Sequence, residues 1–236
     1  MKKAVLSLIL ILSAAMSAIY ISAKGTTPTA VTGNETVGAH ADPSMELYRE
    51  LGLSGLCRYE AFEQAIKGYD KIQLRKKDIL VIIDFSKPSD EERMFVVNVP
   101  ARKLVHHTHV AHGRNSGERY ATAFSNKPGS HQSSLGFYLT GSTYQGGNGY
   151  SLLLDGLEKG INDKARERSI VIHSAAYADP DFIRNQGRLG RSFGCPSLPT
   201  KVSGQVIDTI KDGALLFIYA DNPDYEQKST IIDGNS

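Results

Sequence analysis

Apolar residues recur with helical spacing early in the chain and in continuous runs further on. After Tyr59 the apolar positions follow the i, i+3, i+4, i+7 pattern of a helix with one buried face, at Phe62, Ala65, Ile66 and Tyr69. A shorter helix is predicted just before it, in the segment MELYREL that follows Asp42, Pro43 and Ser44. We expect both short helices to pack against the main body of the protein.

From Asp78 onward the pattern changes to apolar and β-branched runs divided by turn residues, which is typical of strands. The predicted strands are DILVIIDF, RMFVVNV, KLVHHTHVAHG, SLGFYLTG, YSLLLDGL, SIVIH and ALLFIYA, and a turn in KPSDEE separates the first two. A further helix is predicted over 202–210, with Val202, Val206 and Ile210 on one face. Many strands and few helices favour a mainly β, sandwich-like domain with its loops gathered at one edge.

The first residues have a different pattern. Lys2 and Lys3 precede an apolar run that ends near Ala18, and small residues follow up to Ala23. This pattern predicts a signal peptide over 1–23, with an uncleaved membrane anchor as the alternative. Both interpretations place the domain outside the cytoplasm, in the periplasm or cell envelope. We expect a flexible linker over 24–41, the domain itself over 42–222, and a C-terminal tail over 223–236.

Composition and charge narrow the class of protein. The chain has 236 residues, of which 41% are hydrophobic and 22% charged, which suits one globular domain with a substantial core. Its formal net charge is +2, and 25 basic and 25 acidic residues remain without Lys2 and Lys3. No basic stripe indicates a nucleic-acid partner. Contact with a membrane is expected only through the N-terminal segment, if it is not cleaved.

The chain has only two cysteines, and they lie in different surroundings. Cys57 stands in GLSGLCRYEAF at the entrance to a predicted helix, where we interpret it as a small buried hydrophobe. A disulfide between the two is the alternative in an exported protein, although a domain with its own core has little need of one long-range bridge. Cys195 lies in GRLGRSFGCPSLP, a turn rich in glycine and bounded by proline, and is predicted to present its thiol at the surface.

The predicted strand SIVIH ends on His173, which can face this turn from a strand end. A histidine beside a cysteine suits thiol acyl transfer, because the thiolate is the nucleophile and the imidazole promotes its formation. The backbone N–H groups of Gly194 and Cys195 are candidates for stabilising the oxyanion that follows attack on a carbonyl. Ser192 is a candidate for a hydrogen bond within the turn or to substrate.

The S-x-G-C turn after a histidine resembles the bacterial L,D-transpeptidase catalytic domain, here as Ser192, Phe193, Gly194 and Cys195. The segments AHGRNSG, FSNKPGSHQSSLGFYLTG, GYSLLLDGLEKGIND and IVIHSAAY are similar to the murein L,D-transpeptidase branch, so the resemblance covers about 59–219. It implies the fold of that domain and acyl transfer on peptidoglycan stem peptides without a metal or organic cofactor. Cys195 is then the nucleophile, and His173 is the base that becomes the acid for the departing D-alanine.

The sequence departs from the family pattern beside the thiol. Phe193 stands where the family usually has histidine, Ser174 stands where glycine is expected after His173, and Pro196 and Ser197 replace a segment that carries arginine. We therefore expect the substrate carboxylate to be bound by an arginine from elsewhere. The candidates for substrate binding are Arg114, Arg188, Arg191, Ser192, His112, Ser134 and Tyr138, with Ser133 beside them.

Other functions compete with this interpretation. His107, His109 and His112 could together bind zinc, but no nearby aspartate or glutamate supports this, and we predict no metal. A sortase needs an arginine after the cysteine, and none follows Arg191. An L,D-carboxypeptidase that trims tetrapeptide stems, or a wall-binding domain without turnover, remains open.

Overall fold

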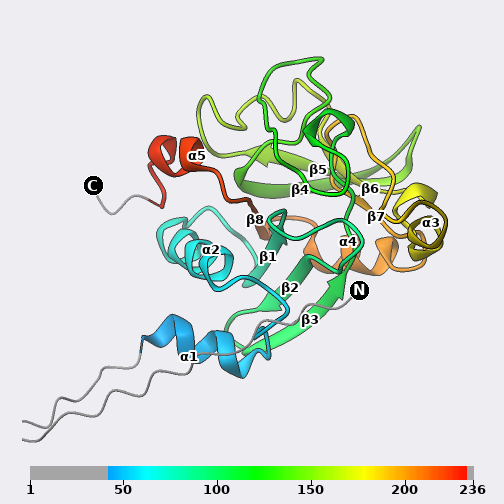
Figure 1. Cartoon of the computed structure of the whole chain (residues 1–236). Helices are drawn as coiled ribbons and strands as arrows, with labels where there is room; N and C mark the ends of the chain where they lie inside the picture. The colour runs from blue at the N-terminus through cyan, green and yellow to red at the C-terminus, as the bar shows by residue number, and fades with distance from the viewer. Residues whose placement is uncertain (1–41, 233–236) are drawn as a thin grey trace, which may run out of the picture. The chain divides into compact units, whose positions relative to one another are not determined.

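The computed structural model describes residues 42–232, so the predicted signal peptide and linker lie outside the described residues. Two of its helices lie before the first strand, as expected (Figure 1). Helix α1 (Pro43–Glu50) is capped by Asp42, whose carboxylate accepts the Ser44 N–H at 3.0 Å. Helix α2 (Tyr59–Lys71) buries the predicted apolar face. A Cβ on Gly68 would lie 2.1 Å from the Phe137 ring, so the helix packs directly on the sheet.

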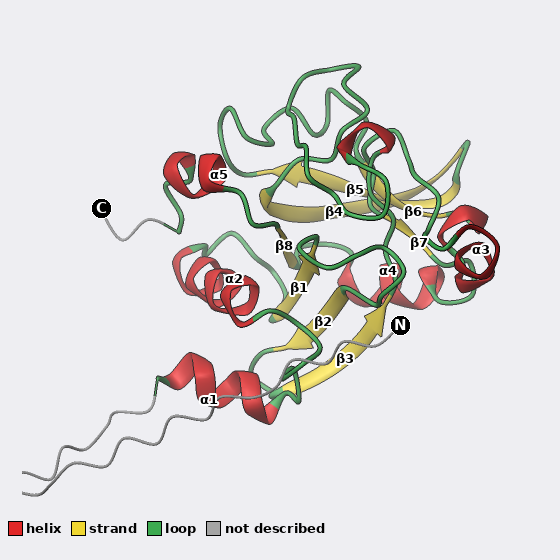
Figure 2. Cartoon of the chain, in the orientation of Figure 1, coloured by secondary structure: helices red, strands yellow, loops and turns green. Residues whose placement is uncertain are grey.

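Eight strands form one mixed sheet, which confirms the mainly β, sandwich-like prediction. In Figure 2, β1 to β3 run at a steep angle to β4 and β5, so the sheet bends between these two parts. The strand order is β3-β2-β1-β8-β4-β5-β6-β7. The strands are β1 (Ile79–Asp84), β2 (Met94–Asn98), β3 (Lys103–Thr108), β4 (Gly136–Gly146), β5 (Gly149–Gly156), β6 (Val171–Ser174), β7 (Ser197–Leu198) and β8 (Leu215–Tyr219).

The core lies between α2 and the middle of the sheet. Strands β1 and β8 pair in parallel and are buried almost throughout, which is why they read as continuous apolar runs rather than alternating ones. The rings of Phe137 on β4 and Phe217 on β8 stack with centroids 4.3 Å apart. Burial of apolar side chains contributes roughly 25 cal/mol per Å², so this centre supplies much of the stability that holds the loops.

Several short elements lie outside the predicted pattern. These are β7, α3 (Pro180–Gln186), α5 (Pro223–Lys228) and two single 3₁₀ turns, η1 (Arg114–Ser116) and η2 (Ala176–Ala178). The predicted helix near 202–210 is α4 (Ser203–Ile210). The segment predicted as a C-terminal tail begins with α5, whose Tyr225 is buried and donates to Glu158 Oε2 at 3.2 Å. Within residues 42–232, no helix is long and apolar enough to cross a membrane.

Candidate active site

Residues 191–196, which we call the thiol turn, connect α3 to the short strand β7. Two hydrogen bonds attach the start of the turn to the segment after β3: Ser192 N–H donates to His112 O at 2.9 Å, and Arg114 N–H donates to Ser192 O at 2.7 Å. Just beyond the turn, Ala111 N–H donates to Ser197 O at 2.9 Å. The turn is therefore held at both ends by one segment of main chain.

Ser192 shapes the thiol turn from inside. Its hydroxyl donates to Cys195 O at 2.7 Å and accepts the Gly194 N–H at 3.0 Å. The side chain is 5% exposed, so the structure favours the role within the turn over contact with substrate. The same bonds correct the predicted oxyanion site. The Gly194 N–H is already engaged, whereas the Cys195 N–H has no acceptor within residues 42–232.

Gly194 is required by the conformation of the turn. Its φ is +124°, a region that residues with a side chain rarely adopt. A Cβ there would also lie 2.8 Å from Gln132 O and 3.0 Å from Ile170 Cδ1. The backbone beside Cys195 therefore packs against two loops without room for a side chain.

The Cys195 thiol lies against the loop that leads into β6. Its Sγ donates to Ser169 O at 3.7 Å, and the Val171 N–H donates to the sulfur. Burial raises the pKa of the thiol, and the Val171 N–H and the Arg168 charge oppose this rise. Both cysteines are free thiols; Cys57 is buried, as predicted, and burial raises its pKa strongly.

His173 lies at the end of β6, directly opposite Ser197 of β7 and therefore two positions along from Cys195. Its Nδ1 lies 2.9 Å from Ser174 O, and because a carbonyl only accepts, Nδ1 carries the proton. In the neutral ring Nε2 is then an acceptor, and the Ser197 hydroxyl 3.0 Å away donates to it. The Tyr177 hydroxyl completes this chain, 2.9 Å from Ser197 Oγ.

Burial shifts the pKa values of Cys195 and His173 in opposite directions, each against its charged form. Burial lowers the pKa of His173, although the bond to Ser174 O opposes this change. Burial raises the pKa of Cys195 at the same time. Both changes oppose charge separation between the thiol and the imidazole before substrate binds.

The three predicted carboxylate-binding arginines differ in their partners. Arg188 and Arg191 both pair with Glu118, at 3.1 and 2.6 Å. Arg114 has no carboxylate partner within the described residues, and its guanidinium lies 5.7 Å from the centre of the Phe193 ring. Phe193 is 64% exposed, and Arg114 is the one of these three arginines that has no carboxylate partner among the described residues.

Two residues predicted to bind substrate are buried instead, which corrects those predictions. His112 and Tyr138 are both 0% exposed, and a substrate cannot touch a side chain without accessible surface. The Tyr138 hydroxyl donates to Ser134 O at 3.0 Å. Ser133 and Ser134 are also almost fully buried, and the Ser134 hydroxyl accepts from Arg168 at 2.6 Å.

His112 is locked between two partners. Arg93 Nη2 donates to its Nδ1 at 2.8 Å, and its Nε2 donates to Gly117 O at 3.3 Å. Burial, with the Arg93 charge, lowers the pKa of His112 to about 3. The ring is therefore neutral and serves to support the main chain that holds the thiol turn.

The histidines on β3 and after it have other partners. His106 Nε2 lies 2.9 Å from Thr209 Oγ1. Glu92 lies 3.6 Å from His107 Nδ1 and 4.0 Å from His109 Nδ1, so a carboxylate is present where the sequence suggested none. Even so, no group of three or more metal-ligating residues exists in the part of the chain that the structure describes.

Three residues of the site were missed by sequence reasoning: Arg168, Tyr177 and Ser197. Only Ser197 carried a signal, because it follows Cys195 by two and period-two spacing puts both on one face of an extended segment. Tyr177 belongs to the single 3₁₀ turn η2 and Arg168 to a loop, and neither is long enough or regular enough for periodicity to indicate which way a side chain points.

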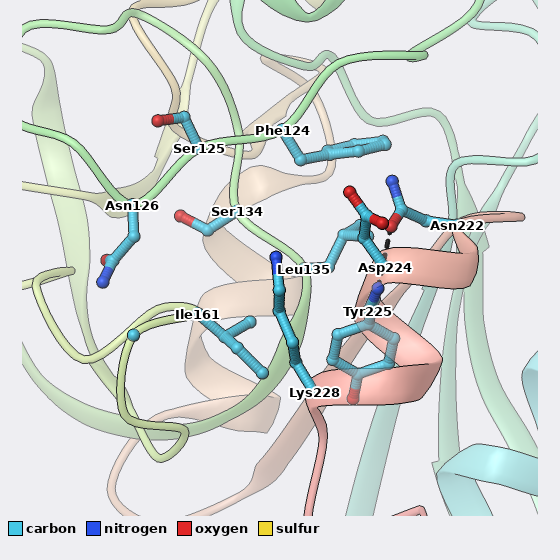
Figure 3. Close-up of a pocket in the computed structure, with 11 residues that line it drawn as sticks. Phe124, Ser125, Asn126, Ser134, Leu135, Ile161, Asn222, Asp224, Tyr225 and Lys228 are labelled. Atoms are coloured by element: carbon cyan, nitrogen blue, oxygen red, sulfur yellow. Dashed lines mark hydrogen bonds between the residues drawn. The ribbon is translucent and has the colours of Figure 1, made fainter.

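Two pockets open near the ends of the site loops. Figure 3 shows a pocket between α5 and the loops that contain Ser125, Ser134 and Ile161. Its volume is about 170 Å³. Lys228 and Asp224 of α5 point into it. A second pocket of about 400 Å³ lies beyond the end of β7; its lining includes Pro199, Thr200 and Asp179.

The family model for the L,D-transpeptidase catalytic domain matches residues 54–219. Among solved structures, an L,D-transpeptidase from Mycobacterium smegmatis has 12% identity and a TM-score of 0.37, with 61% of this chain and 59% of that chain covered. The chain thus spans about three fifths of that protein.

Two further solved structures are similar at comparable levels. The helical cell shape determining protein Pgp2 from Campylobacter jejuni has 12% identity and a TM-score of 0.40, over 67% of this chain and 56% of that chain. An L,D-transpeptidase from Stackebrandtia nassauensis has 15% identity and a TM-score of 0.37, over 76% and 77%. No curated protein matches the chain.

Proposed function

The chain belongs to the L,D-transpeptidase catalytic domain family, and from this premise we propose that it is a peptidoglycan L,D-transpeptidase with Cys195 as its nucleophile. The observation that carries the proposal is the pairing of β6 with β7, in which His173 stands opposite Ser197, two positions after Cys195. Because this pairing brings His173 beside the end of the turn that carries Cys195, it supports acyl transfer.

In the first half of the reaction, Cys195 Sγ attacks the carbonyl at the L-centre of the third residue of a stem tetrapeptide. The thiol proton passes to Nε2 of His173 as the C–S bond forms. The oxyanion accepts a hydrogen bond from the Cys195 N–H, which has no acceptor within residues 42–232. His173 then gives the proton to the departing amine, D-alanine leaves, and a thioester remains.

In the second half, an amine of a neighbouring stem attacks the thioester, and His173 takes a proton from that amine. The C–S bond breaks, the Cys195 thiolate regains a proton from His173, and a new amide crosslinks the two stems. The Ser197 hydroxyl can stay hydrogen-bonded to His173 through both halves of the reaction, because it donates to the neutral ring and accepts from the protonated one.

Export belongs to the same proposal. Stem peptides are extracytoplasmic, so residues 1–23 direct the chain to the periplasm or cell envelope. The alternatives that keep the fold are an L,D-carboxypeptidase, in which water replaces the amine, and a wall-binding domain without turnover.

Incubation of the full chain with purified tetrapeptide stems, followed by mass spectrometry, tests the proposal. Crosslinked dimers together with free D-alanine are the expected products, and Cys195→Ala should form neither. Tripeptide without dimer would mean a carboxypeptidase. Absence of both products, with Cys195 left unlabelled by a thiol-reactive β-lactam, would overturn the enzymatic proposal in favour of wall binding.

A further inference from the structure

Arg168, in the loop between β5 and β6, holds a positive charge against the thiol turn. Its Nη1 donates to Ser125 O at 2.7 Å and to Ser134 Oγ at 2.6 Å. Its Nη2 donates to Gln132 O at 2.5 Å and to Ser130 Oγ at 3.3 Å. All four acceptors are uncharged, so they fix the guanidinium in place without neutralising it.

Neighbouring arginines have carboxylate partners. Arg188 and Arg191 pair with Glu118, and Arg166 pairs with Asp155. Over residues 42–232, by contrast, no carboxylate pairs with Arg168. A guanidinium remains protonated at neutral pH even though burial lowers the pKa of Arg168. A half-buried charge of this kind favours an anion close by.

Two groups that can become anions interact with this charge, the Tyr138 hydroxyl and the Cys195 thiol, and the thiol has the lower ordinary pKa. A Cβ built on Gly194 would lie 3.3 Å from Arg168 Nη2, so the guanidinium lies against the residue that precedes Cys195. The residue after Arg168 reaches the same place, because Ser169 O accepts from Cys195 Sγ. The guanidinium thus fills the space beside Gly194 where a side chain would begin, and its charge acts on the Cys195 thiol.

We propose that Arg168 is a positioning residue that stabilises the thiolate of Cys195 and braces the thiol turn against the loop over 125–134. The effect of this role on turnover rests on the proposed acyl transfer. Its effect on the reactivity of the thiol does not, because that reactivity can be measured without substrate.

The surroundings of the thiol agree with this role. The charge on Arg168 is one of the two influences that oppose the rise in the pKa of Cys195 caused by burial, and the Val171 N–H is the other. Arg191 in the thiol turn is paired with Glu118, and the Tyr177 hydroxyl is uncharged at neutral pH because burial raises its pKa. Among the described residues, Arg168 is the charged side chain that lowers the pKa of Cys195.

The rate of alkylation of Cys195 by iodoacetamide, measured against pH on the full chain, tests the proposal. Peptide mass mapping separates Cys195 from the buried Cys57. Arg168→Gln is expected to slow alkylation at pH 7 about ten-fold and to move the inflection to higher pH, because the thiolate fraction falls. Arg168→Lys keeps the charge but loses the planar fork, so its profile should lie between the two.

A second pair of variants keeps Arg168 itself and so avoids the risk that its loss unfolds the loop. Ser130→Asp places a carboxylate beside the guanidinium, whereas Ser130→Asn places an uncharged group of the same size there. The Asp variant should slow alkylation at pH 7 at least three-fold, and the Asn variant should match the wild type.

Profiles of Arg168→Gln and Ser130→Asp that superimpose on the wild-type profile would overturn the proposal. Faster alkylation at every pH with an unchanged inflection would also overturn it, since that result indicates a loosened turn and no electrostatic role. A normal Arg168 effect in a protein without transpeptidase activity would leave this inference intact and reject the proposed function alone.

Discussion

One histidine lies next to each end of the thiol turn, and the two differ in the kind of hydrogen-bond partner that each has. The main chain of His112 accepts from Ser192 at the start of the turn, and His173 faces Ser197 just after its end. Both side chains are nearly inaccessible, at 0% and 4% exposed, and burial lowers the pKa of both. Burial alone therefore does not distinguish a base from a structural histidine.

The direction of the hydrogen bonds distinguishes them. His112 lies between Arg93, which can only donate, and Gly117 O, which can only accept, so neither ring nitrogen can take up a proton without losing a bond. His173 has one fixed partner, Ser174 O, and one reversible partner, the Ser197 hydroxyl. Only His173 can become charged while it keeps both bonds.

The same substitution at both sites gives the largest contrast. His173→Gln is expected to slow acylation of Cys195 by tetrapeptide about 10³-fold, because glutamine cannot carry the proton. His112→Gln keeps one donor and one acceptor for its two partners, so its acylation rate should stay within a few-fold of the wild type. Rapid-quench measurement of D-alanine release compares them. Equal losses in both variants would mean that the two histidines do not differ in function.

The pH dependence of the free energy of unfolding tests whether His112 is a buried, neutral structural residue. Its pKa is about 3 in the folded protein, below the usual 6.5, so the unfolded chain binds the proton more readily. His112 therefore destabilises the fold as the pH falls from 6.5 towards 3, by roughly 3–5 kcal/mol in total. In urea unfolding across this range, the wild type should lose free energy of unfolding relative to His112→Gln as the pH falls. Parallel curves would show that His112 does not titrate in this way.

Removal of the Ser197 hydroxyl should have the smallest effect on kcat/KM. Ser197→Ala deletes the hydroxyl that stays hydrogen-bonded to His173 during the reaction. Loss of one hydrogen bond of about 1 kcal/mol corresponds to roughly a five-fold loss in kcat/KM. In the wild type the acid limb of kcat/KM should lie below pH 6.5, because the pKa of His173 is lowered. Ser197→Thr, which keeps a hydroxyl, is the matched control. A wild-type rate in Ser197→Ala would remove the hydroxyl from the mechanism.

Sequence reasoning went furthest where local periodicity decides the structure. The helical spacing around Phe62 and the apolar runs of β1 and β8 predicted their elements, because side chains at those positions face a core on a regular period. Strand β7 was missed, since two residues are too short for a period to show.

The two histidines mark the limit of such reasoning. His112 and His173 each end a predicted strand next to a small residue, so the local sequence does not tell them apart. Tyr138 was likewise placed at the substrate groove, yet the structure buries it beneath Ser134. Partners far away in the sequence decided both outcomes.

By itself the sequence determined the main strands, the longer helices and the turn that presents Cys195, because each depends on neighbours within a few positions. Tertiary structure alone decided which groups surround the thiol. Arg168 reaches Gly194 and Tyr177 reaches Ser197 only because β6 and β7 pair and the loops close over them. Hydrogen bonds and charges act over a few ångströms in space, a distance that position along the chain does not encode.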